Sequence, residues 1–452
     1  MPDTPKPGAD IRIMSFIVPG SNPNFKLREF NTLYGVLCIL VFSMAVVTNQ
    51  DLFYNVDVIW LLQMLFIVPF LWTVRQHVIP GIGKNLRAYP WTSLLIGLWV
   101  TSLTISYISA PFDFSEYSLA RIRMLSRYVQ TFTYVVFFFC VRDFLTRNRL
   151  SVTPVVFCIV ASVFFVAICF PVSMMFSETY TPEFSKQWYS SPVFNMHIRH
   201  TGYQITAASA ALLIFLHARS GYSNHYLLVS LVLWTFLFWC GGRAAAASLM
   251  ATGLLVGLFL YSKQLPLRHY LVSLIGLALI SFLFSEWLSV FHWNGLMRGV
   301  ERSLEVAGFD SVSSGRLKVW LTTIEYIVRY PLFGLGPEGY VFMPGRVYGV
   351  HPHNIFLQFL IEWGLIGTIL FLTILARAFF AGFMSHVWGG KTSPATLSFG
   401  SVAGGCIIVA LGIHSLTDGT FYHPYPTACL AIAFAIWTIP PNVTLSDGSG
   451  AS

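Results

Sequence analysis

The amino-acid sequence predicts an all-α polytopic membrane protein that crosses the bilayer about twelve times. Of its 452 residues, 55% are hydrophobic and only 10% are charged, whereas soluble domains carry about a quarter charged residues. The apolar residues form runs long enough to approach or cross a bilayer, and short polar loops separate them. The sequence contains neither an internal repeat nor a low-complexity tract. These observations indicate one large helical bundle in a membrane.

The predicted spans fall into two groups on either side of a long loop, residues 291–353. Nine spans are expected within residues 31–290 and three within residues 354–439. Residues 1–30 are expected to be a retained cytoplasmic tail, because the start lacks the apolar run and cleavage site of a signal peptide. Twelve spans place residues 440–452, the other expected tail, on the same side. The predicted spans are Thr32–Val47, Val58–Val74, Trp91–Ser109, Met124–Val141, Thr153–Phe170, Tyr203–His217, Tyr226–Trp239, Ala244–Tyr261, Tyr270–Val290, Ile355–Ala376, Phe399–His414 and Thr427–Ile439.

The charge of the loops predicts which side of the membrane each one faces. With the N-terminus inside, the loops assigned to the cytoplasm hold a modest excess of Lys and Arg, and the outer loops 49–57 and 415–426 hold none. Cations that gather against this rule are better explained by function than by topology. They lie at Arg121–Arg127, Lys186–Arg199, Arg243 and the loop of residues 291–353.

The outer loop of residues 291–353 is long enough to carry structure or function of its own. Helices are expected at Val300–Val306 and at Gly315–Arg329, and Pro331 is expected to end the second one before a glycine-rich turn. Apolar residues recur near helical spacing in the second helix and predict an apolar face. They are Leu317, Trp320, Leu321, Ile324 and Ile327.

The sequence His351-Pro352-His353-Asn354, at the end of this loop, carries the strongest candidates for chemistry. Histidine titrates near neutrality and can accept or donate a proton. Pro352 favours an extended or turn conformation, and Asn354 is a good N-cap for the span that follows. One histidine at a helix start is more often structural than catalytic, but two beside an asparagine favour a function. The residues alone leave open whether His351 or His353 is a base, and His351 and Asn354 are also candidates for contact with the substrate.

Further polar residues on the same predicted face supply candidate substrate contacts. Arg243 stands at a span boundary after two glycines, where a charge is costly unless it binds something. A snorkelling interfacial arginine is an equally good interpretation. Arg316 alone fits a solvated helix face, although arginine also suits bidentate contact with a diphosphate. The remaining candidates for substrate contact are Lys318, Arg199, His200 and Asp418, of which Asp418 could orient a base or an arginine.

Several classes of function are disfavoured by what the sequence lacks. It has no DxD, HExxH, GxSxG or Walker motif, so we expect no metal, no cofactor, no serine hydrolase and no nucleotide-driven pump. Its basic residues lie in short loops between apolar segments, which fits anionic or phosphate-bearing membrane lipids and not nucleic acid. The seven cysteines lie mostly inside apolar segments without a CxxC pair and are expected in the core.

Several motifs together resemble the shared core of the O-antigen ligase and Wzy polymerase superfamily. The resemblance covers chiefly residues 240–425, whereas the first six spans match only in topology. Its motifs are moderately specific for the superfamily and less specific for one member of it. They are Gly242-Arg243, Arg316–Trp320, Pro331–Gly336, His353–Gln358, Glu362-Trp363-Gly364 and the segment around Asp418.

The resemblance implies a GT-C-like, metal-independent glycosyltransferase of the Gram-negative inner membrane, with its site at the periplasmic face. An O-antigen ligase moves a polysaccharide from undecaprenyl diphosphate to a sugar hydroxyl of lipid A–core, with inversion. His353 would then be the base or the positioner of the acceptor hydroxyl, and Arg243 and Arg316 would bind the diphosphate. A place for Arg199 rests on loop position alone. Proton removal and charge stabilisation are the two tasks that such a reaction needs.

Three alternatives remain open at the level of sequence. An O-antigen polymerase uses the same donor with a lipid-linked acceptor, and a protein O-oligosaccharyltransferase is a more distant possibility. A lipid-linked oligosaccharide transporter would place polar residues near the midplane of the membrane. Here the polar residues gather at one face, which favours an enzyme.

Overall fold

The computed structural model contains only helices as regular elements in the part of the chain that it describes. This result confirms the all-α prediction, and a helix overlaps each of the twelve predicted spans. The twelve crossings and the GT-C-like arrangement stay predictions, because eight of these helices are short. The described residues are 34–43, 60–75 (without 62, 66 and 73), 89–112, 118–147, 150–175, 201–217, 223–261, 267–288, 295–297, 315–347, 349–388 and 399–439. Four helices are long and apolar enough to cross a membrane: Pro90–Ile108, Ala120–Arg147, Leu267–Leu288 and Ile355–His386.

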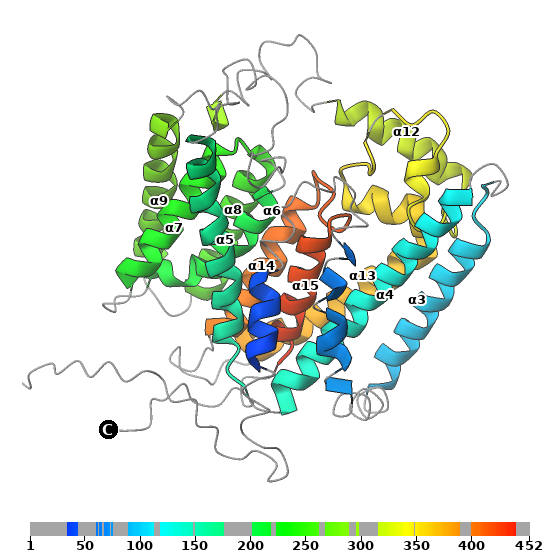
Figure 1. Ribbon diagram of the computed structural model, residues 1–452, viewed down its shortest axis with the longest axis horizontal. Helices are drawn as coiled ribbons and strands as arrows, with labels where there is room; N and C mark the ends of the chain where they lie inside the picture. The colour runs from blue at the N-terminus through cyan, green and yellow to red at the C-terminus, as the bar shows by residue number, and fades with distance from the viewer. Residues whose placement is uncertain are drawn as a thin grey trace, which may run out of the picture.

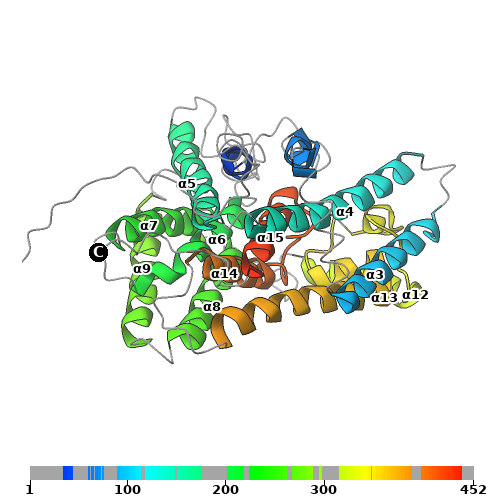
Figure 2. The same cartoon turned by 90° about the horizontal axis from the view of Figure 1, so that it is seen from below.

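Two groups of helices flank a central pair, as Figures 1 and 2 show. The central pair packs against both groups, since α14 contacts α6 and α8 while α15 contacts α4. The central pair is α14 (Phe399–His414) and α15 (Pro424–Trp437). One group is α5 (Thr153–Met175), α6 (Thr201–Leu212), α7 (Ser223–Trp239), α8 (Arg243–Val256) and α9 (Leu267–Leu288). The other is α3 (Pro90–Ile108), α4 (Ser118–Arg147), α12 (Arg316–Arg329) and α13 (Ile355–Phe383).

Glycines let the two central helices approach each other closely. A Cβ atom added to Gly404 would lie 2.9 Å from the carbonyl oxygen of Ala433, and one added to Gly405 would lie 2.6 Å from the ring of Trp437. Small residues permit this kind of backbone approach between membrane helices. The close contact fixes the segment between α14 and α15, which carries Asp418.

Helix α13 is broken at Gly364, whose φ of 66° and ψ of −174° leave the helical region. The glycine-rich turn that begins at Pro331 inserts its backbone into the break and replaces the helical hydrogen bonds that the break removes. Four bonds join the two segments: Leu335 N–H to Ile361 O (2.7 Å), Gly336 N–H to Glu362 O (3.0 Å), Leu365 N–H to Pro331 O (2.8 Å) and Ile366 N–H to Leu332 O (3.3 Å). The turn thereby becomes an integral part of α13, because buried backbone groups need such partners.

Helix α12 confirms the predicted helix at Gly315–Arg329 but turns a different face inward. Val319 and Thr323 are its buried residues, and Val319 packs on Leu335 of the glycine-rich turn. Leu321 and Ile324, which belong to the predicted apolar face, are 56% and 44% exposed. That face is therefore only partly buried, because the core beneath α12 comes from a segment that helical spacing does not take into account. The predicted tails and the predicted helix Val300–Val306 lie outside the described residues.

Candidate functional site

The turn before α13 is fixed by Asn354, which is the predicted N-cap. Its Oδ1 accepts hydrogen bonds from the backbone N–H groups of Phe356 (3.0 Å) and Leu357 (3.1 Å). Its Nδ2 donates to the carbonyl of Leu416 (2.9 Å), and the N–H of Ile355 donates to the carbonyl of Ser415 (2.9 Å). The cap is therefore also a tether that holds the segment after α14 against the turn. A direct contact between Asn354 and a substrate stays a prediction.

This tether brings Asp418 to His353. The Nδ1 atom of His353 lies 3.0 Å from Oδ1 of Asp418, and the N–H of Gly419 donates to the same oxygen at 2.8 Å. The carboxylate accepts the Nδ1 proton, which makes Nε2 the basic nitrogen of a neutral imidazole. His353 has a φ of 53°, which is uncommon for a residue other than glycine and typical of functional sites. The pair has the arrangement of a general base and the group that orients it.

Arg316 approaches the other oxygen of the same carboxylate. Its Nη2 lies 3.9 Å from Oδ2 of Asp418, and both side chains are about a quarter exposed. Trp320, one helical turn further on the same face of α12, donates from Nε1 to the carbonyl of Pro352 at 2.9 Å. Helix α12 is thus docked on the turn that carries the histidines, and Arg316 is held beside them.

His351 is buried behind His353. The two rings are 4.2 Å apart, and Nδ1 of His351 accepts the backbone N–H of His353 at 3.2 Å. The ring also packs 5.0 Å from Tyr422 and directly against Gly419, where any side chain would collide with it. His351 therefore supports the strained backbone of His353. This position favours His353 over His351 as the group that meets a substrate.

The charge of Asp418 is stabilised by its neighbours. Burial opposes ionisation, but the hydrogen bond with His353 and the proximity of His414, His353 and His351 outweigh it and hold the pKa of the carboxyl well below its usual value. Asp418 is consequently a carboxylate throughout the neutral range. An anion at this position attracts Arg316 and favours the protonated form of a histidine that has accepted a proton.

The other predicted site residues differ in how far the structure supports a place for them in the site. Arg243 begins α8, and burial and then the positive charge of Arg316 lower the pKa of its guanidinium, so the two arginines are close enough to interact electrostatically. Lys318 is exposed and stands two residues after Arg316, on a different face of α12. Among the described residues, no contact is seen between Lys318 and His351, His353 or Asp418. Arg199 and His200 lie outside the described residues.

A second polar network, next to the histidines, combines Arg123, Arg127, Glu338 and Tyr422. Arg123 Nη2 lies 2.8 Å from Oε1 of Glu338, and the hydroxyl of Tyr422 donates to that oxygen at 3.1 Å. Arg127 donates to the carbonyl of Tyr422 and lies 4.3 Å from the centre of its ring. Glu338 is 1% exposed and has a φ of 61°. The cations of α4 were expected to be functional, but nothing in the sequence singled out Glu338 or Tyr422.

The donor atoms of His351, His353 and Asp418 lie within 4.8 Å of one another, close enough to hold a metal ion, whereas the sequence predicts none. Two features of the described residues oppose a bound cation. Arg316 already places a positive charge 3.9 Å from the carboxylate, and Nδ1 of His351 already accepts a hydrogen bond. The donor set therefore fits the orientation of a base better than it fits a resident metal.

Comparison with known proteins gives two findings. Residues 228–372 match the family model described as O-antigen ligase. A segment of 95 residues is 36% identical to the exopolysaccharide production protein ExoQ of Rhizobium meliloti (strain 1021), and it covers 18% of this chain and 22% of the relative. The aligned part thus spans about a fifth of the relative's length.

The matched region contains much of the site described above. It spans α7 to the first part of α13 and includes Arg243, Arg316 and His353, whereas Asp418 lies beyond its end. Over residues 228–372, the chain is therefore similar to the family described as O-antigen ligase.

Proposed function

We propose that this protein is an O-antigen ligase of the bacterial inner membrane, a GT-C-like glycosyltransferase whose site faces the periplasm. Its donor would be a polysaccharide on undecaprenyl diphosphate and its acceptor a sugar hydroxyl of lipid A–core. The observation that carries the proposal is the shared carboxylate of Asp418, which meets His353 on one oxygen and Arg316 on the other. A base and a cation side by side are what transfer from a diphosphate to a hydroxyl requires.

His353 would act on the acceptor. Its Nε2 takes the proton of the attacking hydroxyl while the hydroxyl oxygen forms a bond to the anomeric carbon of the donor sugar. The bond from that carbon to the diphosphate breaks, the configuration inverts and undecaprenyl diphosphate leaves with the electron pair. Asp418 orients the ring through Nδ1 and stabilises the imidazolium that forms.

Arg316 and Arg243 would stabilise the departing diphosphate. The two charges repel each other in the structure, and an anion between them would relieve this repulsion. Arg123 and Arg127 are poorer candidates, since Arg123 is paired with Glu338 and Arg127 is buried against Tyr422. Arginine suits the role because its planar fork makes two parallel hydrogen bonds to phosphate oxygens.

A polymerase is the second candidate. The match to a protein of exopolysaccharide production supports it, because a polymerase would use the same base and the same cations with a lipid-linked glycan as the acceptor. The arrangement of His353, Asp418 and Arg316 serves either acceptor equally well.

Complementation tests the proposal and separates the two candidates. We expect the wild-type gene, expressed in a strain without its ligase, to restore long-chain lipopolysaccharide on a gel, whereas Arg316→Ala does not. Lys318→Ala is the matched control on the same helix and should restore it fully, because Lys318 is exposed and lies on a different face. Polymer that accumulates on the lipid carrier alone would support the polymerase and contradict the ligase.

We expect transfer by the purified protein to be unaffected by EDTA, because the proposed mechanism uses arginines where other transferases use a metal ion. We expect added Zn²⁺ to inhibit transfer only at high concentration, since zinc could reach the donors of His351, His353 and Asp418 only against the positive charge of Arg316 beside the carboxylate. The measurement is the rate of glycan transfer against metal and chelator concentration. Inactivation by EDTA that Zn²⁺ or Mg²⁺ reverses would contradict the metal-independent mechanism.

A further inference from the structure

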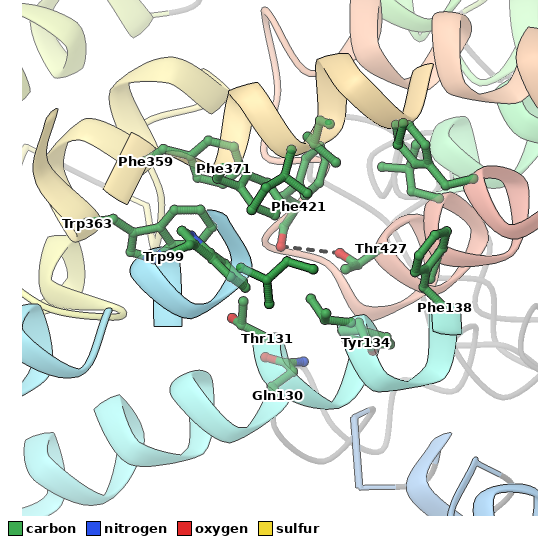
Figure 3. Close-up of a pocket in the computed structure, with 18 of the residues that line it drawn as sticks. Trp99, Gln130, Thr131, Tyr134, Phe138, Phe359, Trp363, Phe371, Phe421 and Thr427 are labelled. Atoms are coloured by element: carbon green, nitrogen blue, oxygen red, sulfur yellow. Dashed lines mark hydrogen bonds between the residues drawn. The ribbon is translucent and has the colours of Figure 1, made fainter. Parts of the chain in front are cut away.

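A cavity lies beside the site, in a part of the bundle that the proposed reaction does not use. It holds about 1040 Å³ of empty space, its open side included, between α3, α4, α13 and α15. Figure 3 shows aromatic rings from several helices around it, with Gln130 and Thr131 of α4 facing the space beneath α13. The rings include Trp99, Phe138, Phe359, Trp363, Phe371 and Phe421. A mostly apolar lining with a few polar groups at one end is the usual character of a ligand site.

The lining changes from polar to apolar with depth. On α4 it runs from Arg127 and Gln130 to Phe139, and Arg127 contacts Tyr422 in the network next to His351. On α13 it runs in the same direction, from polar residues next to the capped start of the helix to apolar residues near its far end. The polar end of the cavity therefore lies on the side of the site. A rise of 1.5 Å per residue gives the α4 wall a length of about 18 Å, a large part of the bilayer's hydrocarbon core.

The polar end offers hydrogen-bonding groups that the described residues leave unsatisfied. Nε2 of Gln130, Oε1 of Gln358 and Oε1 of Glu362 have no hydrogen-bond partner, although these side chains are only 3%, 4% and 2% exposed. Arg127 donates to Oε1 of Gln130 and so turns the amide nitrogen of that residue the other way. Buried polar atoms without partners are costly, and each one calls for an explanation such as a ligand.

The chemistry of this end identifies the class of ligand. Arg127 is the one cation of the cavity lining and Glu362 is its one acidic side chain, so this end does not present the pair of cations that would suit a diphosphate. Besides the guanidinium of Arg127, which is bonded to Gln130 and to the carbonyl of Tyr422, this end presents a donor on Gln130 and acceptors on Gln358 and Glu362. A diphosphate carries several negative charges and accepts hydrogen bonds only, so it would meet the two acceptors unfavourably. An ester carbonyl can accept from Gln130, and a hydroxyl can also donate to Glu362.

We propose that this cavity binds one acyl chain of a membrane lipid, with the ester or hydroxyl oxygen of the chain at Gln130 and Glu362 and its methylene groups among the aromatic rings. An isoprenoid chain would fit the apolar part, but it has no neutral polar group to place at the polar end. The proposal does not require the ligase activity, because binding here involves neither His353 nor Arg316.

Photocrosslinking in lipid nanodiscs tests the proposal. One probe is phosphatidylethanolamine with a diazirine in one acyl chain, and the other is polyprenyl phosphate with a diazirine in its chain. We expect the acyl probe to label peptides of α4 and α13 that line the cavity, at several times the yield of the isoprenoid probe. Equal or greater labelling of these peptides by the isoprenoid probe, or no labelling by the acyl probe, would overturn the proposal.

Two variants locate the bound chain. Ala378→Trp fills the deep end of the cavity and should reduce acyl labelling at least fivefold, whereas Ala376→Trp, at an exposed position of the same helix, should leave it unchanged. Gln130→Leu removes the donor at the polar end and should also reduce labelling. Undiminished labelling in either Ala378→Trp or Gln130→Leu would refute the assigned position. Because the readout is labelling, a failure of the ligase assay leaves this test intact.

Discussion

Replacing Gly364 by alanine is expected to prevent stable folding of the protein. The φ of 66° and ψ of −174° at this position belong to a region that only glycine occupies readily. An added Cβ atom would also lie under 3.0 Å from backbone atoms of Leu332 and Phe333. Backbone atoms cannot move aside as a flexible side chain can, so the turn would be expelled from the break in α13. Backbone strain alone costs about 1–3 kcal/mol, and the collision adds to it.

The measurement is the yield of monodisperse protein by size-exclusion chromatography and its unfolding temperature in detergent. We expect Gly364→Ala to reduce the yield sharply and to lower the unfolding temperature by roughly 5 °C or more. Gly97→Ala is the matched control, because Gly97 lies within α3 with no atom within 4 Å of an added Cβ. Alanine there should be neutral or stabilising. Normal yield and stability of Gly364→Ala would contradict the inserted turn.

The break in α13 also marks the limit of what the sequence predicts. Hydropathy locates the apolar segments well, because the hydropathy of a segment depends only on the residues of that segment. Ile355–Ala376 is predicted as one continuous span despite Gln358 and Glu362, and hydropathy does not distinguish Gly364 from any other glycine in it. The break depends on a turn about thirty residues earlier, and no pattern of local spacing joins the two. The resemblance contained both motifs, Pro331–Gly336 and Glu362-Trp363-Gly364, but did not say that they form one unit.

The candidate site also combines local features, which the sequence predicts, with contacts between distant residues, which it does not predict. The cap formed by Asn354 is local and was predicted correctly from residue type. The contact between His353 and Asp418 joins residues 65 positions apart. The sequence indicated that both lie on the same face and that Asp418 could orient a base or an arginine, but it did not pair Asp418 with His353. Arg123 and Glu338 are 215 positions apart in the sequence. Glu338 is the one charged residue of the glycine-rich turn, which runs from Pro331 to Gly339. Its positive φ and its burial are properties of the folded chain, so the sequence could not single it out.

Replacing His353 by asparagine is expected to lower the rate of transfer by at least about a hundredfold, the lower range for general acid–base catalysis. Asparagine suits this position because it tolerates the left-handed backbone that His353 adopts at a φ of 53°. Its amide can still donate to Asp418, whereas no basic nitrogen remains. The fold should therefore survive while proton removal is lost.

Kinetics against pH separates the loss of a base from the loss of a positioning group. In the wild type the rate should rise as the base loses its proton, and this rise should disappear in His353→Asn, with KM for the donor unchanged. Added imidazole should restore part of the rate, because it supplies the missing base to the vacated space. His351→Gln should keep the pH dependence, since His351 is buried behind His353 and acts on it through a backbone hydrogen bond. If His351→Gln removed the pH dependence and His353→Asn kept it, the base would be His351, and Asp418 would orient a group that does not take the proton.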